Sequence, residues 1–188
     1  MTLWSSEQAW TAGGTNLYRN KDAFYFLPSD NEWYKAAYYN PAGSDYFLYP
    51  TASSSAPTAV ASGTNGGSAV YNSVASVPAI VDSTGGLSPY GTMGQGGNVF
   101  EWNETAFDGT NSLPTESRAV RGGSWGDGAV GLISSGRVLL VPWREFDFVG
   151  FRVASVDAAP IPEPGTWAAM AIFAGGAAYA GWRRRRRA

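Results

Sequence analysis

The most constraining feature of this chain is an uncharged stretch near its C-terminus that is followed by a run of arginines. Residues 165–182 contain no Asp, Glu, Lys or Arg. As a helix rising about 1.5 Å per residue, they would span about 27 Å, close to the hydrocarbon thickness of a bilayer. The sequence predicts a transmembrane helix over residues 166–182 that contacts membrane lipid. A buried helix of a soluble domain is the alternative.

The arginine run predicts on which side of the membrane the tail ends. Basic clusters next to a spanning helix stay on the cytoplasmic side and gain about 1 kcal/mol per arginine from anionic lipid. We therefore expect residues 183–188 to form a basic cytoplasmic tail and the rest of the chain to lie outside. The anchoring residues are Arg183, Arg184, Arg185, Arg186 and Arg187.

The composition of the remaining chain excludes several kinds of chemistry. Outside the arginine run, 8 basic residues face 15 acidic ones, so the charge is 8 − 15 = −7, which argues against a nucleic-acid partner. The chain has no Cys and no His. Thiolate nucleophiles, Ser-His-Asp triads and His-metal sites are therefore excluded within it. The 24 Gly and 11 Pro predict much loop and few regular elements.

Local patterns predict one helix and a few short strands. Ser29 and Glu32 have the spacing of a capping box, and Asn40-Pro41 ends the helix that they begin. Residues 49–77 are rich in Ser, Ala, Thr and Gly and predict a long surface loop. Apolar runs predict strands at residues 79–81, 118–121, 137–141 and 150–153.

The segment before the uncharged stretch adds a recognisable motif. Pro162, Glu163 and Pro164, a span of small residues and a terminal arginine run together resemble the PEP-CTERM sorting signal. The resemblance implies that an exosortase, a membrane protease-transpeptidase, cuts the chain near this motif. It also implies export in a Gram-negative bacterium that makes exopolysaccharide. The protein would pass through the inner membrane and end at the cell surface or in the extracellular matrix, with residues 156–165 as the linker.

Three ordered stretches of the body resemble one family. They are residues 27–33 (LPSDNEW), residues 97–102 (GNVFEW), and residues 121–125 (RGGSW) with 150–152 (GFR). They are similar to the sulfatase-modifying-factor family, which includes the formylglycine-generating enzyme. The resemblance implies an α+β fold over residues 18–155, a C-type-lectin-like variant with little regular secondary structure.

The same family is longer on its N-terminal side. Residues 1–17 would then be the remnant of a longer region. Met1 is followed by no basic and apolar signal sequence, although export requires one. We therefore expect the natural N-terminus to lie further upstream.

The resemblance also implies what the body lacks. In the generating enzyme two cysteines after the Gly-Gly-Ser turn bind copper, and their positions fall on Asp127 and Leu132. Neither residue is a soft thiolate ligand, so no copper and no oxidase activity are expected. Another branch uses His-bound iron, and this chain has no His. We interpret five further residues of the matching motifs as fold-holding: Arg121, Gly122, Gly123, Trp125 and Arg152.

A calcium site is a further implication of the resemblance. In the family, main-chain oxygens matching Gly97 and Val99 and a carboxylate matching Glu101 bind Ca²⁺, which prefers such oxygens. Another oxygen ligand would align with Gly94, which has no side chain. This departure favours a structural role for Glu101 over calcium binding.

These observations lead to one main hypothesis and two alternatives. The main hypothesis is an exported, non-catalytic binding or matrix protein, whose aromatic side chains suit stacking on extracellular polysaccharide. The first alternative is an enzyme that uses acid-base chemistry at Glu101, Glu104, Asp108 and Asp127. The second is a truncated reading frame without function.

Overall fold

The computed structural model describes residues 3–11, 16–111 and 113–156. The chain divides into two compact units, Met1–Ser155 and Val156–Ala188. The expected membrane helix, the sorting motif and the basic tail all lie outside the described residues. Within the described ranges, no helix is long and apolar enough to cross a bilayer.

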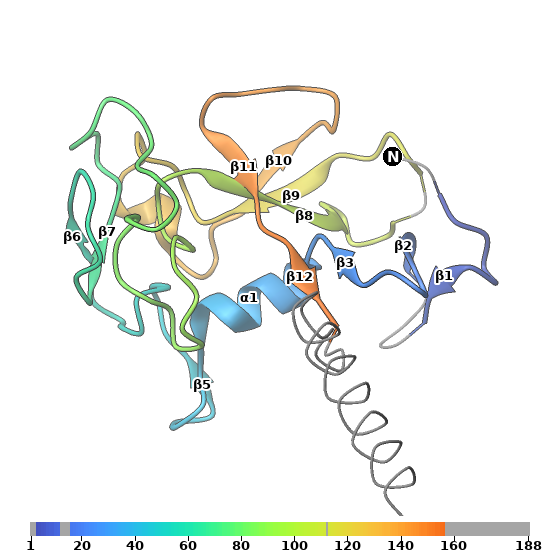
Figure 1. Ribbon diagram of the computed structural model, residues 1–188, viewed down its shortest axis with the longest axis horizontal. Helices are drawn as coiled ribbons and strands as arrows, with labels where there is room; N and C mark the ends of the chain where they lie inside the picture. Colours follow the sequence, from blue (N-terminus) through green and yellow to red (C-terminus); the bar gives the residue numbers. More distant parts are fainter. Residues whose placement is uncertain (1–2, 12–15, 112, 157–188) are drawn as a thin grey trace, which may run out of the picture. The chain divides into compact units, whose positions relative to one another are not determined.

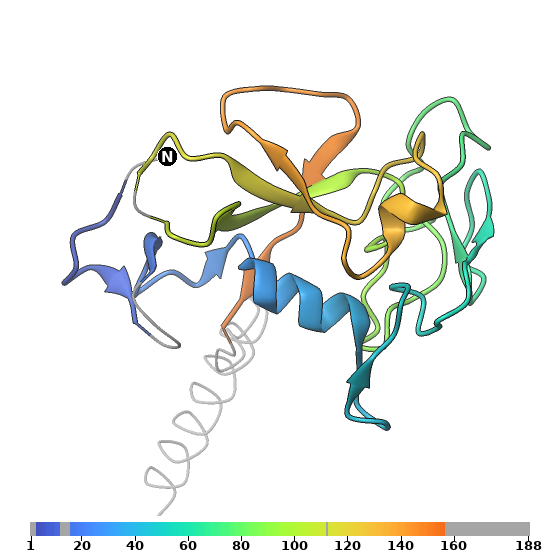
Figure 2. The same ribbon diagram turned by 180° about the vertical axis from the view of Figure 1, so that it is seen from behind.

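A four-stranded sheet forms the centre of the first unit, in the order β10-β9-β8-β11. β8 and β9 pair antiparallel, as do β9 and β10, whereas β11 runs parallel to β8. Figures 1 and 2 show this sheet above α1, the one α-helix among the described residues. The bounds of the sheet strands are β8 Phe100–Ala106, β9 Arg118–Arg121, β10 Val138–Leu140 and β11 Val149–Phe151.

The other strands are short and pair two by two around this centre. All of these pairs are antiparallel except β6 with β7, which is parallel. The pairs are β1 Ala9–Trp10 with β2 Asn16–Asn20, β3 Tyr25–Phe26 with β12 Ala154–Ser155, β4 Tyr39–Asn40 with β5 Asp45–Tyr46, and β6 Thr58–Ala59 with β7 Ser68–Ala69. A one-turn 3₁₀-helix, η1, spans Ala129–Leu132.

Helix α1, Asp30–Tyr38, begins where the sequence predicts. Ser29 Oγ accepts a hydrogen bond from Glu32 N (3.2 Å), and Ser29 N donates to Glu32 Oε2 (2.8 Å). The capping box is therefore confirmed. The helix ends at Tyr38 and the next residue opens β4, so it stops slightly before the predicted boundary at Asn40-Pro41. Its buried residues include Trp33 and Tyr38, both fully buried.

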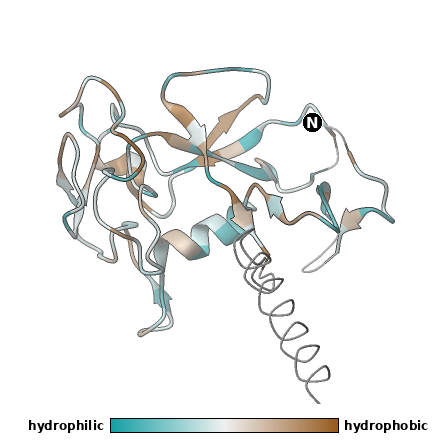
Figure 3. Ribbon diagram, in the orientation of Figure 1, coloured by the Kyte–Doolittle hydropathy of each residue, from teal (hydrophilic) through white to brown (hydrophobic). Residues whose placement is uncertain are grey.

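The strand predictions had mixed outcomes. Strands β9 and β10 confirm those at residues 118–121 and 137–141, whereas β11, Val149–Phe151, overlaps the predicted strand 150–153 only in its first two residues. The strand at 79–81 is wrong: Ile80 and Val81 are 73% and 86% exposed, and no strand of the described part of the chain pairs with them. Figure 3 shows apolar residues on the strands of the central sheet and mixed polarity along α1.

The prediction of a surface loop over residues 49–77 is also wrong in part. Tyr49, Ala69 and Tyr71 pack with Leu132 into one of the hydrophobic clusters of the described domain. Turns and single bridges, such as Val70 with Gly97, set which residues point inward. A periodic sequence pattern marks only helices and regular strands, so the sequence carries no such signal here. We call residues 49–98 the loop lobe.

Candidate functional site

Glu101 on β8, the carboxylate of the expected calcium site, accepts hydrogen bonds from an arginine and a tryptophan. Arg152 donates to both of its oxygens, from Nε at 2.5 Å and from Nη2 at 2.6 Å. Trp33 of α1 donates from Nε1 to Glu101 Oε2 at 2.5 Å. Arg152 Nη2 also donates to the Met93 carbonyl at 3.1 Å. Arg152 therefore joins strand β8 to the glycine-rich turn before it.

A second buried pair ties the start of α1 to β9. Arg121, which is 6% exposed, donates to both carboxylate oxygens of Asp30. Its Nη1 also donates to the carbonyls of Ser134 and Gly136, each at 3.0 Å. Arg137 Nε lies 3.4 Å from Asp30 Oδ2. Arg121 thus connects the helix, the sheet and the loop before β10.

A third group centres on Arg19 of β2, which the sequence analysis did not single out. Its guanidinium donates to Glu104 on β8, from Nε at 3.1 Å and Nη2 at 2.5 Å. It also reaches Glu32, with Nη2 2.6 Å from Oε2. Burial raises the pKa of Glu104 above its usual value, and the hydrogen bonds from Arg19 and Asn16 offset this only in part. For Glu32, burial is outweighed by hydrogen bonds from Arg19 and Ser29, which hold its pKa below the usual value.

The four carboxylates considered for acid-base chemistry do not converge. Glu104 lines a cavity of about 380 Å³, Glu101 one of about 200 Å³ and Asp108 one of about 250 Å³. Asp108 is exposed and accepts hydrogen bonds from Thr110. None of these described cavities is lined by two of the four, whereas acid-base catalysis at a sugar bond needs two carboxylates facing one substrate.

The backbone of the Gly-Gly-Ser-Trp turn, residues 122–125, is hydrogen-bonded to the backbone of Gly97 and Asn98. Gly97 N donates to the Gly122 carbonyl and Trp125 N donates to the Asn98 carbonyl, each at 2.8 Å. Gly122 and Gly123 both have positive φ angles, 96° and 75°. These backbone hydrogen bonds join residues 97–102 to residues 121–125, two of the stretches that resemble the family.

The residues at the two positions that the resemblance assigns to cysteines both have structural contacts. Asp127 Oδ2 accepts hydrogen bonds from Ser124 N (2.9 Å) and Ser124 Oγ (2.5 Å), which closes the turn. Leu132 is fully buried in the hydrophobic cluster with Tyr49 and Tyr71.

The comparison with protein families decides what this fold is. The model of the sulfatase-modifying factor enzyme 1-like domain matches residues 2–156. The chain belongs to this family. A second model, the PEP-CTERM protein-sorting motif, matches residues 160–186. The chain is therefore a sulfatase-modifying-factor-like domain followed by an exosortase sorting signal, which indicates export to the cell surface of a Gram-negative bacterium.

Solved structures confirm the family fold. Variable protein 1 of Treponema denticola matches with a TM-score of 0.52 and 25% identity, covering 70% of this chain and 47% of that protein. The crystal structure of CarF matches with a TM-score of 0.54 and 21% identity, covering 74% and 50%. This chain thus spans about half the length of either protein. No curated protein matches it.

The residues present do not fit the copper centre of the generating enzyme. At the positions that the resemblance assigns to the two thiolates, the chain has a carboxylate that closes its own turn and a buried aliphatic side chain. Cu(I) binds soft sulfur ligands, which neither position supplies. The chain contains no Cys and no His at all, so no other residue of either type could substitute.

The surroundings of Glu101 do not fit calcium either. Both carboxylate oxygens are bound by the Arg152 guanidinium, a cation that would repel Ca²⁺. At Gly94, where a further ligand would stand, φ is +76° and an added Cβ would lie 2.8 Å from Thr84 Oγ1. Among the described residues, no three acidic, His or Cys side chains gather in a way that could hold a metal ion.

Proposed function

We propose that this chain is an exported, exosortase-sorted envelope protein whose sulfatase-modifying-factor-like domain binds a ligand without catalysing a reaction. The observation that carries the proposal is that the chain contains no Cys, and that the positions the resemblance assigns to the catalytic thiols hold Asp127 and Leu132. Each of these residues has a structural contact of its own, in a turn and in a hydrophobic cluster. The fold is thus retained while the residue types needed for copper chemistry are missing.

The hydrogen bonds that the buried carboxylates accept support the same proposal. Glu101, Glu104 and Asp30 each accept hydrogen bonds from an arginine that is itself mostly buried. A buried carboxylate held in this way stabilises the fold and is poorly placed to exchange protons with a substrate. The acid-base alternative is therefore less well supported.

The first experiment measures oxidase chemistry in the full chain, purified in mild detergent. The protein is loaded with Cu(I), dialysed, and assayed for bound copper and for oxygen consumption with a cysteine-bearing peptide. We expect neither stoichiometric copper nor oxygen uptake, while a copper-containing member of the family serves as the positive control. Stoichiometric copper together with oxygen uptake would overturn the non-catalytic proposal.

The second experiment tests sorting in cells. The full chain is followed by immunoblot in a host with its exosortase and in the matching exosortase deletion strain. We expect a shortened form at the surface of the first strain and a full-length, membrane-associated form in the second. Glu163→Ala in the sorting motif should reproduce the deletion result, with Glu145→Ala in the body as control. Identical processing in both strains would refute exosortase sorting.

A further inference from the structure

A continuous row of aromatic rings leads from the core of the domain to its surface. We call its outer part the tyrosine cluster. It begins on α1, crosses the β4–β5 hairpin and ends in the loop lobe. Consecutive ring centroids lie 4.9, 5.3 and 6.3 Å apart. Its members, in order, are Tyr34, Tyr46, Tyr39 and Tyr90.

The inner end of this row is anchored in the core. Tyr34 lies 5.2 Å from the ring of Tyr38, which lies 5.9 Å from Trp33, and the latter two rings are fully buried. Tyr38 Oη donates to the Leu132 carbonyl at 3.0 Å. Aromatic pairs of this kind contribute about 0.5–1.5 kcal/mol each beyond burial. The outer tyrosines are thus held in place before any ligand arrives.

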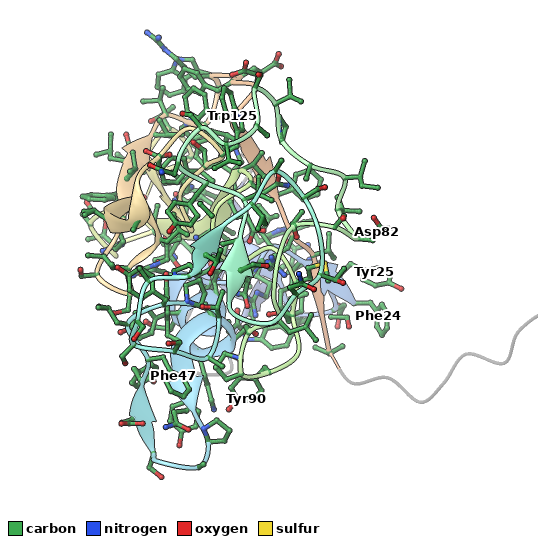
Figure 4. The ribbon with its side chains drawn as sticks, turned by 90° about the vertical axis from the view of Figure 1, so that its left-hand side faces the viewer. Phe24, Tyr25, Phe47, Asp82, Tyr90 and Trp125 are labelled. Atoms are coloured by element: carbon green, nitrogen blue, oxygen red, sulfur yellow. The ribbon has the colours of Figure 1, made fainter. Side chains whose placement is uncertain are left out.

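The outer end of the row is open to solvent. Tyr46 and Tyr90 are each 48% exposed. Figure 4 shows Tyr90 near the base of the hairpin that carries β5, on the opposite side of the view from Trp125. None of the described cavities is lined by a member of the tyrosine cluster. An exposed row of rings suits the side of a long polymer better than a small ligand, which requires an enclosing pocket.

The polar groups beside the tyrosine cluster are balanced in charge. Lys35 Nζ lies 5.6 Å from the centroid of the Tyr39 ring. Across the hairpin, Asn40 Nδ2 donates to Asp45 Oδ1 at 2.8 Å, and Asp45 is exposed. Lys35 and Asp45 therefore border the outer rings with one charge of each sign, while Arg121, 5.1 Å from the Tyr34 ring, is paired with Asp30. Amide and phenol groups beside the rings can exchange hydrogen bonds with hydroxyls.

This chemistry favours one class of ligand. Tyrosine offers an apolar ring face for the C–H face of a sugar and a hydroxyl for its polar edge. Nucleic acid would also stack on the rings but needs a basic groove, whereas the chain outside the arginine run carries 8 − 15 = −7. The same negative charge disfavours an anionic polymer.

We propose that the tyrosine cluster is a binding surface for a neutral polysaccharide, an inference that rests on the non-catalytic binding function proposed above. The occupant is a neutral glycan chain that lies along the row and contacts Tyr46 and Tyr90 most fully. The core aromatic pair beneath keeps the surface preorganised, which lowers the entropic cost of binding.

Affinity gel electrophoresis of the full chain in mild detergent tests this proposal. The gels contain dextran, laminarin or hydroxyethylcellulose as neutral probes, or alginate as an anionic one. We expect retarded migration with at least one neutral probe, weakened about tenfold by Tyr46→Ala and by Tyr90→Ala. The Phe variants at both positions should retain most of the binding because the ring remains. Tyr25→Ala, at a 69% exposed tyrosine outside the cluster, is the matched control.

Each result supports or overturns the proposal. Retardation by no neutral probe, retardation by alginate alone, or retardation that the two alanine variants leave unchanged overturns it. Capture of an envelope protein through these tyrosines, without glycan binding, also overturns it. The oxygen-uptake assay on the same preparations keeps the two proposals apart. If the protein neither consumes oxygen nor is retarded by a glycan, only the proposed glycan-binding surface is refuted. If it consumes oxygen and is also retarded, only the proposed non-catalytic function is refuted.

Discussion

The loop lobe and the sheet with α1 belong to one domain but are stabilised by different interactions. Around the sheet, buried arginines pair with carboxylates on other elements, as Arg121 does with Asp30. The loop lobe contains a single charged residue, Asp82, which is exposed. Its segments are joined by backbone hydrogen bonds, such as Asn98 N to the Val70 carbonyl at 2.6 Å.

This difference predicts which kinds of substitution destabilise each region. A buried ion pair is lost when either side chain is removed, because the remaining charge is left unpaired. Backbone packing is insensitive to most side-chain changes but fails where a Cβ is added at a close approach. The sheet region should therefore respond to loss of charge and the loop lobe to gain of volume.

The largest effect is expected from Arg121→Ala, which leaves Asp30 and the carbonyls of Ser134 and Gly136 without their main donor. We expect a loss of about 3–5 kcal/mol in the free energy of unfolding. Urea denaturation followed by circular dichroism measures it. The exposed Arg144→Ala is the control. Equal stability of the two variants would contradict the importance of buried charge pairs here.

The next effect is expected from Gly97→Ala in the loop lobe. Gly97 has a φ of +73°, and an added Cβ would overlap the Val70 carbonyl. We expect a loss of roughly 3 kcal/mol. Gly91→Ala, at φ +76° in open space, should cost about 1 kcal/mol. Gly128→Ala, in open space without positive φ, should be nearly neutral. Thermal melts of the three variants give this ranking, and a reversed order would refute the close-approach argument.

A smaller effect is expected from Ser29→Ala at the start of α1. The substitution removes the acceptor for Glu32 N and half of the capping box. The expected loss is about 1 kcal/mol, measured by urea denaturation. Ser76→Ala, at an exposed position in the loop lobe, is the control. If both serine variants unfold at the same urea concentration as the parent, the cap contributes nothing measurable.

The smallest effect is the dependence of stability on pH through Glu32. Its pKa is lowered in the folded state, so its stabilising contribution is present above the unfolded value of 4.5 and is lost as pH falls below it. Because its side chain is 46% exposed, screening limits the effect to below about 1 kcal/mol. We expect Glu32→Gln to lose less stability than the parent between neutral and acidic pH in thermal melts. Glu145→Gln, at an exposed site, should follow the parent curve.

Part of the fold was predictable because it depends on short-range physics. The capping box of α1 and the strand that stops at the Gly-Gly turn each involve residues a few positions apart. Residues 79–81 were mispredicted because apolar composition alone cannot show whether a partner strand exists. The tyrosine cluster was missed because Tyr90 is far in sequence from the residues it packs against. The sequence does show Tyr34, Tyr38, Tyr39 and Tyr46 close together along the chain, and this spacing could have indicated an aromatic cluster.

The sequence by itself determined the family, the sorting motif and the absence of Cys and His, because these follow from which residue types are present. Only the tertiary structure decided that Glu101 pairs with Arg152, 51 residues away, and with Trp33, 68 residues away. It also decided which tyrosines reach the surface. Such pairings depend on the path of the whole chain, since a charge or a ring has no preferred partner until the backbone brings one within a few ångströms.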